Sequence, residues 1–206
     1  EQIEQGFEGL QPDSDNETVG RLETKLSQVK YSLDFLSKFS NAKKPLFAQK
    51  VQVDESKRKE YLKDEERLSR IYEICRSIDG KFTEIKSSET KLNSTIAQLK
   101  PWLPLKINLE DIGNTQNTSA MLGFIAGKYE EEFSTLIKAE DLQAYLEKVS
   151  TEKENSYFMI AYHQVCEERI TQLLKQTGWT KVTFSEYLGT PGENIDRLMA
   201  EKEELE

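Results

Sequence analysis

The sequence is poor in the residues that form most catalytic and metal sites. It has one histidine and two cysteines in 206 residues, and it contains no P-loop, no GxGxxG turn and no paired-cysteine spacing. Cys75 and Cys166 fall in separate parts of the chain, so they indicate neither a disulfide framework nor a metal knuckle, and they fit a reducing, cytosolic setting. We therefore expect a protein that is not an enzyme and that needs no cofactor.

Long apolar stretches are missing too. There is no run of 18 or more apolar residues and no signal-peptide core, which predicts that nothing in this chain spans a bilayer. The chain starts without Met and stops within a helical pattern, as a piece of a longer protein would. Only 36% of the residues are hydrophobic and 32% are charged, which favours long, solvent-exposed helices over one compact core.

Clustered positive charge is also scarce. The formal net charge is -9, and the densest basic run, residues 57–59, is followed at once by acidic side chains. An acidic surface without a basic patch repels the phosphates of nucleic acids. We expect no nucleic-acid partner.

Apolar residues spaced three and four apart are the main positive signal. Such spacing predicts one helix from Val19 to about residue 39, with a seam formed by Val19, Leu22, Leu26, Val29, Leu33 and Leu36. After a connector over residues 42–53, Asp54 is the expected N-cap of a second helix that continues to residue 100, about 70 Å in length. Its predicted coiled-coil seam consists of Leu68, Ile71, Cys75, Ile78, Phe82, Ile85, Leu92, Ile96 and Leu99. Glu89 interrupts this seam, either to specify a partner or because the pair opens to solvent there.

The period changes after Trp102. Strands are expected over residues 119–125, 143–149, 156–162 and 179–184, with a turn over residues 150–155 and amphipathic helices after the first and third strands. The order β-α-β-β-α-β is that of a ferredoxin-like lobe, with both helices on one face of an antiparallel sheet. Lone His163 and Cys166 are expected to be structural, since no catalytic partner accompanies either.

A second helical arm then begins. Thr190 is the expected N-cap, Pro191 the first helical residue and Glu193 the closing residue of a capping box, and Ile195 and Leu198 resume the seam. The predicted fold is α+β, a long antiparallel coiled-coil helical hairpin with the ferredoxin-like lobe at its tip. The expected divisions are residues 1–53, 54–101, 102–188 and 189–206. The residues expected at the arm-lobe junction are Pro101, Trp102, Gly123, Gly178, Thr190 and Pro191, with Trp179 packing beside them.

Four short segments in this order carry a family resemblance: Pro101-Trp102, Asp111-Ile112-Gly113, Leu122-Gly123-Phe124 and Gly189-Thr190-Pro191. The layout resembles the N-terminal cytoplasmic part of subunit I, also called subunit a, of V-type ATPases. The family's opening strand and helix and its transmembrane half do not occur in this sequence.

The resemblance implies a non-catalytic stator piece on the cytoplasmic face of the cell membrane. Its partners would be the peripheral stalk subunits E and G, bound at an unassigned part of the lobe 102–188, and other subunits of the rotary ATPase that transports protons or sodium ions. Membrane contact would come only through the missing C-terminal half. The alternatives are a ferredoxin-like ligand-sensing or dimerisation module on a coiled-coil relay, and a parallel dimeric coiled-coil tether.

Overall fold

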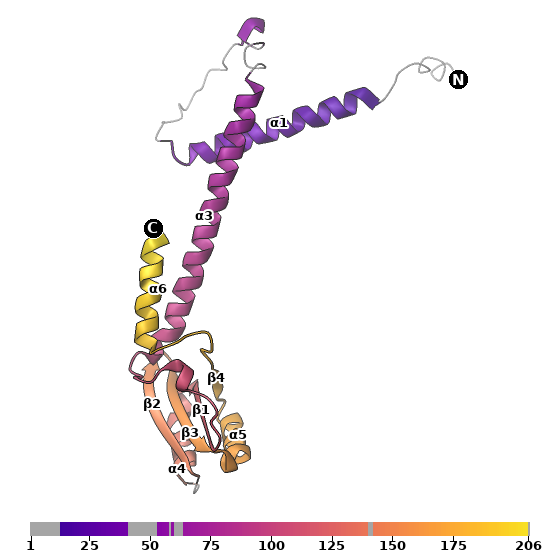
Figure 1. The fold of residues 1–206 in the computed structure, drawn as a ribbon. Coiled ribbons are helices and arrows are strands. Elements are labelled where there is room, and N and C mark those ends of the chain that lie inside the picture. The colour runs from indigo at the N-terminus through magenta and orange to yellow at the C-terminus, as the bar shows by residue number, and fades with distance from the viewer. Residues whose placement is uncertain (1–12, 41–52, 58, 60–63, 140–141, 206) are drawn as a thin grey trace, which may run out of the picture. The chain divides into compact units, whose positions relative to one another are not determined.

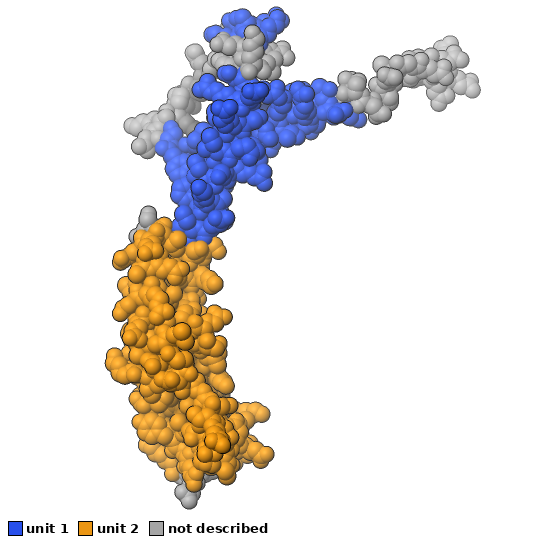
Figure 2. All heavy atoms as spheres, in the orientation of Figure 1, with its two compact units in different colours: residues 1–86 blue, residues 87–206 orange. Residues whose placement is uncertain are grey.

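The computed structural model describes residues 13–40, 53–57, 59, 64–139 and 142–205. It divides into two compact units, residues 1–86 and residues 87–206 (Figure 2). In the described residues, helices accompany a four-stranded antiparallel sheet (Figure 1), and the predicted α+β class is confirmed. The four-part division expected from the sequence stays a prediction.

The first unit brings helix α1 against the first half of helix α3. These helices run Asp13–Ser37 and Glu65–Leu99. The Tyr31 hydroxyl of α1 donates a 2.7 Å hydrogen bond to Asp79 Oδ2 of α3. The same tyrosine ring meets that of Tyr72 edge-on, with 5.6 Å between centroids. Together with the ion pair between Lys25 and Glu65, these contacts fix where α1 meets its neighbour.

The face of α1 that meets α3 is not the predicted one. The buried or contacting side chains form a second stripe with the same three-four spacing: Lys25, Gln28, Ser32, Phe35 and Phe39. Exposed fractions of 48–62% belong to residues of the expected seam: Val19, Leu22, Leu26, Leu33 and Leu36. Of this seam only Val29 is half-buried, beside Leu68 and Ser69 of α3, and the packing of the other five members on another helix stays a prediction. The two stripes share one period, so spacing alone did not distinguish them, and the aromatic rings decided the contact.

Helix α3 is shorter than expected. It has 35 residues, a length of about 52 Å, and begins at Glu65 instead of directly after Asp54. Asp54 caps a short helical turn, since the Lys57 N–H donates to Asp54 Oδ1 at 2.8 Å. Residues 58 and 60–63 lie outside the described residues, as does the expected connector up to residue 52.

The second unit contains the sheet, and its elements follow the predicted order β-α-β-β-α-β. In sequence they are β1 (Thr118–Ala126), α4 (Glu130–Ala139), β2 (Ala144–Glu152), β3 (Asn155–His163), α5 (Glu167–Gln176) and β4 (Thr180–Val182). The strand order across the sheet is β2-β3-β1-β4, and each neighbouring pair is antiparallel. A single sheet therefore joins strands that lie far apart in the sequence.

The turn between β2 and β3 is tighter than the six polar residues suggested. β2 continues to Glu152 and β3 starts at Asn155, so only two residues remain in the turn. The strands extend because backbone pairing resumes after a bulge between Lys148 and Ser150, whatever the polarity of the side chains. In this turn Lys153 has a φ of 54°, in the left-handed region.

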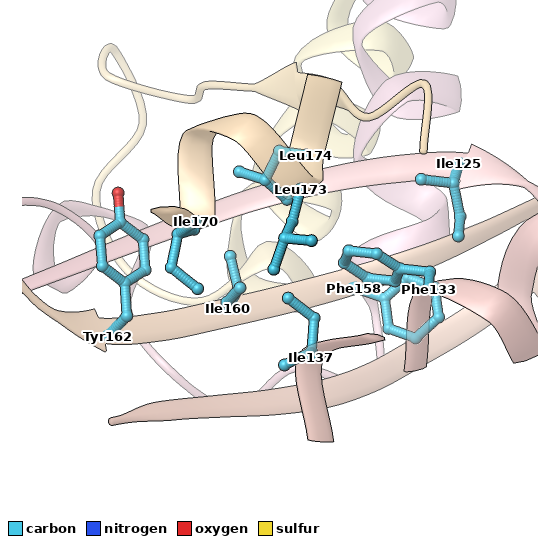
Figure 3. Close-up of a cluster of buried hydrophobic side chains, with 9 residues drawn as sticks. All are labelled: Ile125, Phe133, Ile137, Phe158, Ile160, Tyr162, Ile170, Leu173 and Leu174. Atoms are coloured by element: carbon cyan, nitrogen blue, oxygen red, sulfur yellow. The ribbon is translucent and has the colours of Figure 1, made fainter. Parts of the chain in front are cut away.

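Helices α4 and α5 cover one face of the sheet and enclose a hydrophobic core (Figure 3). This helix-side core consists of Ile125, Phe133, Ile137, Phe158, Ile160, Tyr162, Ile170, Leu173 and Leu174. Alternate residues of β3 supply it, as the two-residue period of a strand requires. Burial, followed by a hydrogen bond with Glu167, raises the pKa of Tyr162 to about 12. The opposite face of the sheet is left for the ends of the long helices.

The strained turn gives a first prediction. Replacing Lys153 with glycine should increase the free energy of unfolding by about 0.5–1 kcal/mol, because glycine occupies the left-handed region without strain. Urea denaturation of the chain measures the change. Glu154→Gly is the matched control and should lower stability, since Glu154 has no positive φ to relieve. Equal effects of the two substitutions would contradict this explanation.

Candidate functional site at the helix-sheet junction

A second hydrophobic core lies where the long helices end on the sheet. This junction core consists of Leu99, Trp102, Leu105, Leu109, Leu122, Met159, Phe184 and Ile195. It draws residues from α3, from the sheet, from the loops around them and from α6 (Pro191–Leu205). Its position makes it the part of unit 2 through which the helices and the sheet contact each other.

Trp102 is at the centre of the junction core. Its side chain is fully buried, and its ring meets the rings of Tyr157 and Phe184 edge-on, at centroid distances of 5.4 and 6.2 Å. Pro101 directs it there, because proline does not continue α3 past Leu99 and lies in the short 3-10 turn Lys100–Trp102. The Ser150 hydroxyl donates a 2.6 Å hydrogen bond to the Pro101 carbonyl and so ties β2 to the helix end.

A capping box starts α6, as predicted. The Thr190 N–H donates to Glu193 Oε2 at 2.8 Å, and the Glu193 N–H donates to Thr190 Oγ1 at 3.3 Å. Pro191 takes the first helical position and is buried. The backbone hydrogen bond from Thr190, followed by the one from its hydroxyl, lowers the pKa of Glu193. The cap is therefore strongest while Glu193 is ionised, and it is lost as the pH falls through this lowered pKa.

Asn194 is a junction residue that the sequence analysis missed. Its side chain is 1% exposed, and its amide donates to the carbonyls of Leu188 and Thr190 at 2.9 and 2.8 Å. The Gly189 N–H in the same loop donates to Glu110 Oε2 at 2.7 Å. These bonds hold the loop before α6. The sequence offered one clue to this role. Asn194 lies on the same face of the predicted helix as the apolar residues Pro191 and Ile195, where a polar side chain needs hydrogen-bond partners.

The last turns of α3 lie along α6. Ile96 and Leu198 pack against the junction core that contains Leu99 and Ile195, and Leu92 is buried as well. Farther along, Lys202 Nζ lies 3.7 Å from Glu89 Oε1, so Glu89 has an ion-pair partner on α6. Since higher numbers on α6 pair with lower numbers on α3, the two helices run in opposite directions.

The other expected seam residues lie in unit 1. Cys75 is buried there and Ile71 is half-buried. Exposed fractions of 40–51% belong to the remaining four: Leu68, Ile78, Phe82 and Ile85. Only Leu92, Ile96, Leu99, Ile195 and Leu198 are brought together in unit 2, and a continuous coiled-coil seam stays a prediction.

Two glycines expected at the junction lie next to Trp179, which packs against the helix-side core. A Cβ on Gly123 would be 2.2 Å from Trp179 Cε2, so this glycine lets the indole lie flat against β1. Gly178, at a φ of 69°, ends α5 and turns the chain toward Trp179. Trp179 packs 5.5 Å from Phe133 beside the helix-side core, so the expectation that it packs at the arm-lobe junction is wrong.

A groove of about 550 Å³ lies beside the junction core. Its lining includes Trp102, Phe124 and Tyr157, together with Gln98 and Lys181. It offers aromatic rings together with polar side chains, among them Ser94, Thr180 and Thr183.

No group of three or more metal-ligating side chains gathers within the described residues. His163 Nδ1 accepts a 3.3 Å hydrogen bond from the Val165 N–H, a local contact at the end of β3. None of the described helices combines the length and the apolarity that crossing a membrane requires. The junction is the candidate site with the most extensive described contacts, and it connects the ends of α3 and α6 to the sheet.

Comparison with solved structures finds a likeness to the crystal structure of the cytoplasmic N-terminal domain of subunit I, a homolog of subunit a, of V-ATPase. The TM-score is 0.53 at 15% sequence identity, and the match covers 95% of this chain and 63% of that chain. No family model and no curated protein matches the sequence. The predicted resemblance is confirmed at the level of the fold.

Gly123→Ala should lower the free energy of unfolding of unit 2 by about 1–3 kcal/mol, because the new methyl group overlaps Trp179 and the Thr180 carbonyl. Urea denaturation followed by tryptophan fluorescence measures this. Gly113→Ala is the matched control, since a Cβ there meets nothing within 4 Å. If both variants unfold like the parent chain, Trp179 does not lie against Gly123.

Asn194→Ala should cost about 1–3 kcal/mol of stability, because the hydrogen bonds from the buried amide to the Leu188 and Thr190 carbonyls are lost. The exposed Asn93, substituted in the same way, provides the control and should change stability by less than about 0.5 kcal/mol. The midpoint of urea unfolding distinguishes the two variants. A stability loss confined to Asn93→Ala would contradict the role given to Asn194.

Proposed function

We propose that this chain is a non-catalytic stator piece of a rotary V-type ATPase, from the cytoplasmic half of its membrane-anchored subunit. The observation that carries the proposal is the fold likeness, which extends over 95% of the chain. The chain spans only 63% of that neighbour, and at 15% identity the likeness reaches the fold alone. The role in proton or sodium transport is therefore our inference.

We infer a finer architecture in keeping with this role. The strand order β2-β3-β1-β4, with two helices on one face, supports a ferredoxin-like lobe. The opposite directions of α3 and α6, and the pair Glu89–Lys202, support an antiparallel coiled-coil hairpin with the lobe at its tip. Such a hairpin is stiff because its side chains interlock along the seam.

The junction core suits a part that must resist torque. A stator fails if the connection between its shaft and its docking head bends freely. Here Trp102 is fully buried between the helix end and the sheet, and Asn194 secures the loop at the start of the other helix. Because interiors are close-packed, a tilt of either helix would disturb contacts in the whole core.

In this proposal the lobe docks the peripheral stalk formed by subunits E and G. The rest of the parent subunit, outside this chain, would hold it at the cytoplasmic face of the membrane. The chain would perform no chemistry, and it would keep the ion-conducting part from rotating relative to the stalk.

The groove beside Trp102 favours a second candidate, a ligand-sensing module. Its volume of about 550 Å³ lies in the range of small-molecule sites, and aromatic rings line it. A bound ligand would contact both α3 and the sheet, and could thereby alter the helix connection. This candidate predicts a rise in melting temperature with a metabolite, and no need for a stalk.

Titration of this chain with purified E–G stalk heterodimer tests the proposal by calorimetry. We expect association with a Kd of about 50 µM or tighter. Gly123→Ala should weaken the binding by destabilising the lobe, whereas Gly113→Ala should leave it unchanged. Absence of binding to a chain whose lobe is shown to be folded would count against the stator role, and thermal stabilisation by a metabolite would then favour the sensing module.

A further inference from the structure

The strongest unexplained feature of the molecule is an apolar stripe along α1. The α1 stripe comprises Val19, Leu22, Leu26, Leu33 and Leu36. Every member is at least 48% exposed, while the helix meets α3 through a different face. Contiguous apolar surface of this kind marks an interaction site. It lies outside the sheet-bearing unit, so this inference does not depend on the proposed function.

The spacing of the apolar residues in the stripe indicates that its partner is a helix. The residues alternate three and four apart, as in the a and d positions of a heptad, with Val29 completing the series. In this heptad register Val19, Leu26 and Leu33 take the a positions. Knobs-into-holes packing requires a partner helix whose apolar residues repeat with the same heptad period.

Charged residues beside the stripe identify the partner and its direction. On one side Lys25 forms an ion pair with Glu65 and faces α3, so that side is occupied. On the other side Glu23 and Lys30 hold successive e positions, both are exposed, and neither has an ion-pair partner among the described residues. In an antiparallel pair of identical helices, e positions face e positions, so each Glu23 meets Lys30 of the other copy. The two-fold axis makes this contact twice.

A parallel arrangement fits less well. There the g position of one helix faces the next e position of the other, which brings Lys25 against Lys30 of the second copy. Like charges at such sites disfavour pairing. In the antiparallel arrangement the layers pair Val19 with Leu36, Leu22 with Leu33, and Leu26 with Val29. Val29 is half-buried and also lines a small cavity with Leu68 of α3, so the exposed leucines supply most of the contact.

We propose that a second copy of this chain docks antiparallel along the α1 stripe, with reciprocal ion pairs between Glu23 and Lys30. The contact is isologous, so it closes as a dimer and leaves no repeating surface. α3 lies on a different face of α1 and remains in place. The interface is small and belongs to the weak class.

Sedimentation equilibrium of the full chain tests the dimer. We expect a reversible monomer–dimer equilibrium with a Kd of about 10 µM. Leu26→Glu should abolish it, and Ser27→Glu, which adds the same charge off the stripe, should not. Circular dichroism checks that both variants keep their helices. A chain that stays monomeric at about 200 µM would overturn the proposal and would mean that another polypeptide segment covers the stripe.

Charge reversal tests whether the two α1 helices pair antiparallel or parallel, and it leaves every apolar residue of the stripe in place. Lys30→Glu should weaken the antiparallel dimer about tenfold, because it places two glutamates together at both ends. The same change would strengthen a parallel dimer, since it would replace a contact of two lysines by an attraction to Lys25. The double variant Glu23→Lys/Lys30→Glu restores opposite charges and should recover the affinity.

Asp34→Lys, at an outward position, is the charge-matched control for Glu23→Lys. Tighter association of Lys30→Glu, or no recovery in the double variant, would overturn the antiparallel arrangement.

Discussion

The second unit depends on the burial of Trp102 where α3 ends. Large aromatic side chains contribute most to a core when they are fully enclosed, and this one touches rings from β3 and from the loop after β4. Leu99 and Ile195 complete the enclosure from the two helices. Since both helices enclose the same ring, neither can change its angle to the sheet alone.

Polar contacts beside this apolar core hold the loop that leads into α6. In the loop before α6, the buried Asn194 amide donates to the Leu188 carbonyl, and the Glu110 carboxylate accepts from the Gly189 N–H. On the other face of the sheet, Gly123 allows Trp179 to lie close enough to fill the space under α4 and α5. The sheet is therefore enclosed on both sides by different means. The first unit contrasts with it, since a few rings, the Tyr31 hydrogen bond and the Lys25–Glu65 ion pair hold α1 to α3 while five apolar side chains of α1 stay exposed.

The sequence predicted the regular parts of the fold well. Local signals located the capping box at Thr190, the end of α3 at Pro101 and the order of strands and helices in the lobe. Features decided by distant contacts were predicted badly. The polar residues after Ser150 pair as strands because a backbone partner is available, and α1 uses Phe35 where spacing favoured Leu33. Asn194 was missed for the same reason, since its partners are carbonyls whose position depends on the folded loop.

By itself the sequence determined the α+β class, the order of helices and strands in the lobe, the end of α3 and the start of α6, because caps, prolines and side-chain periods act within a few residues of the chain. Only the tertiary structure decided which stripe of a helix is covered and which tryptophan enters which core. It also decided which acid meets which base, as for Glu89 and Lys202. Such choices follow from packing between segments far apart in the chain, and several local patterns fit equally well until one of them is buried.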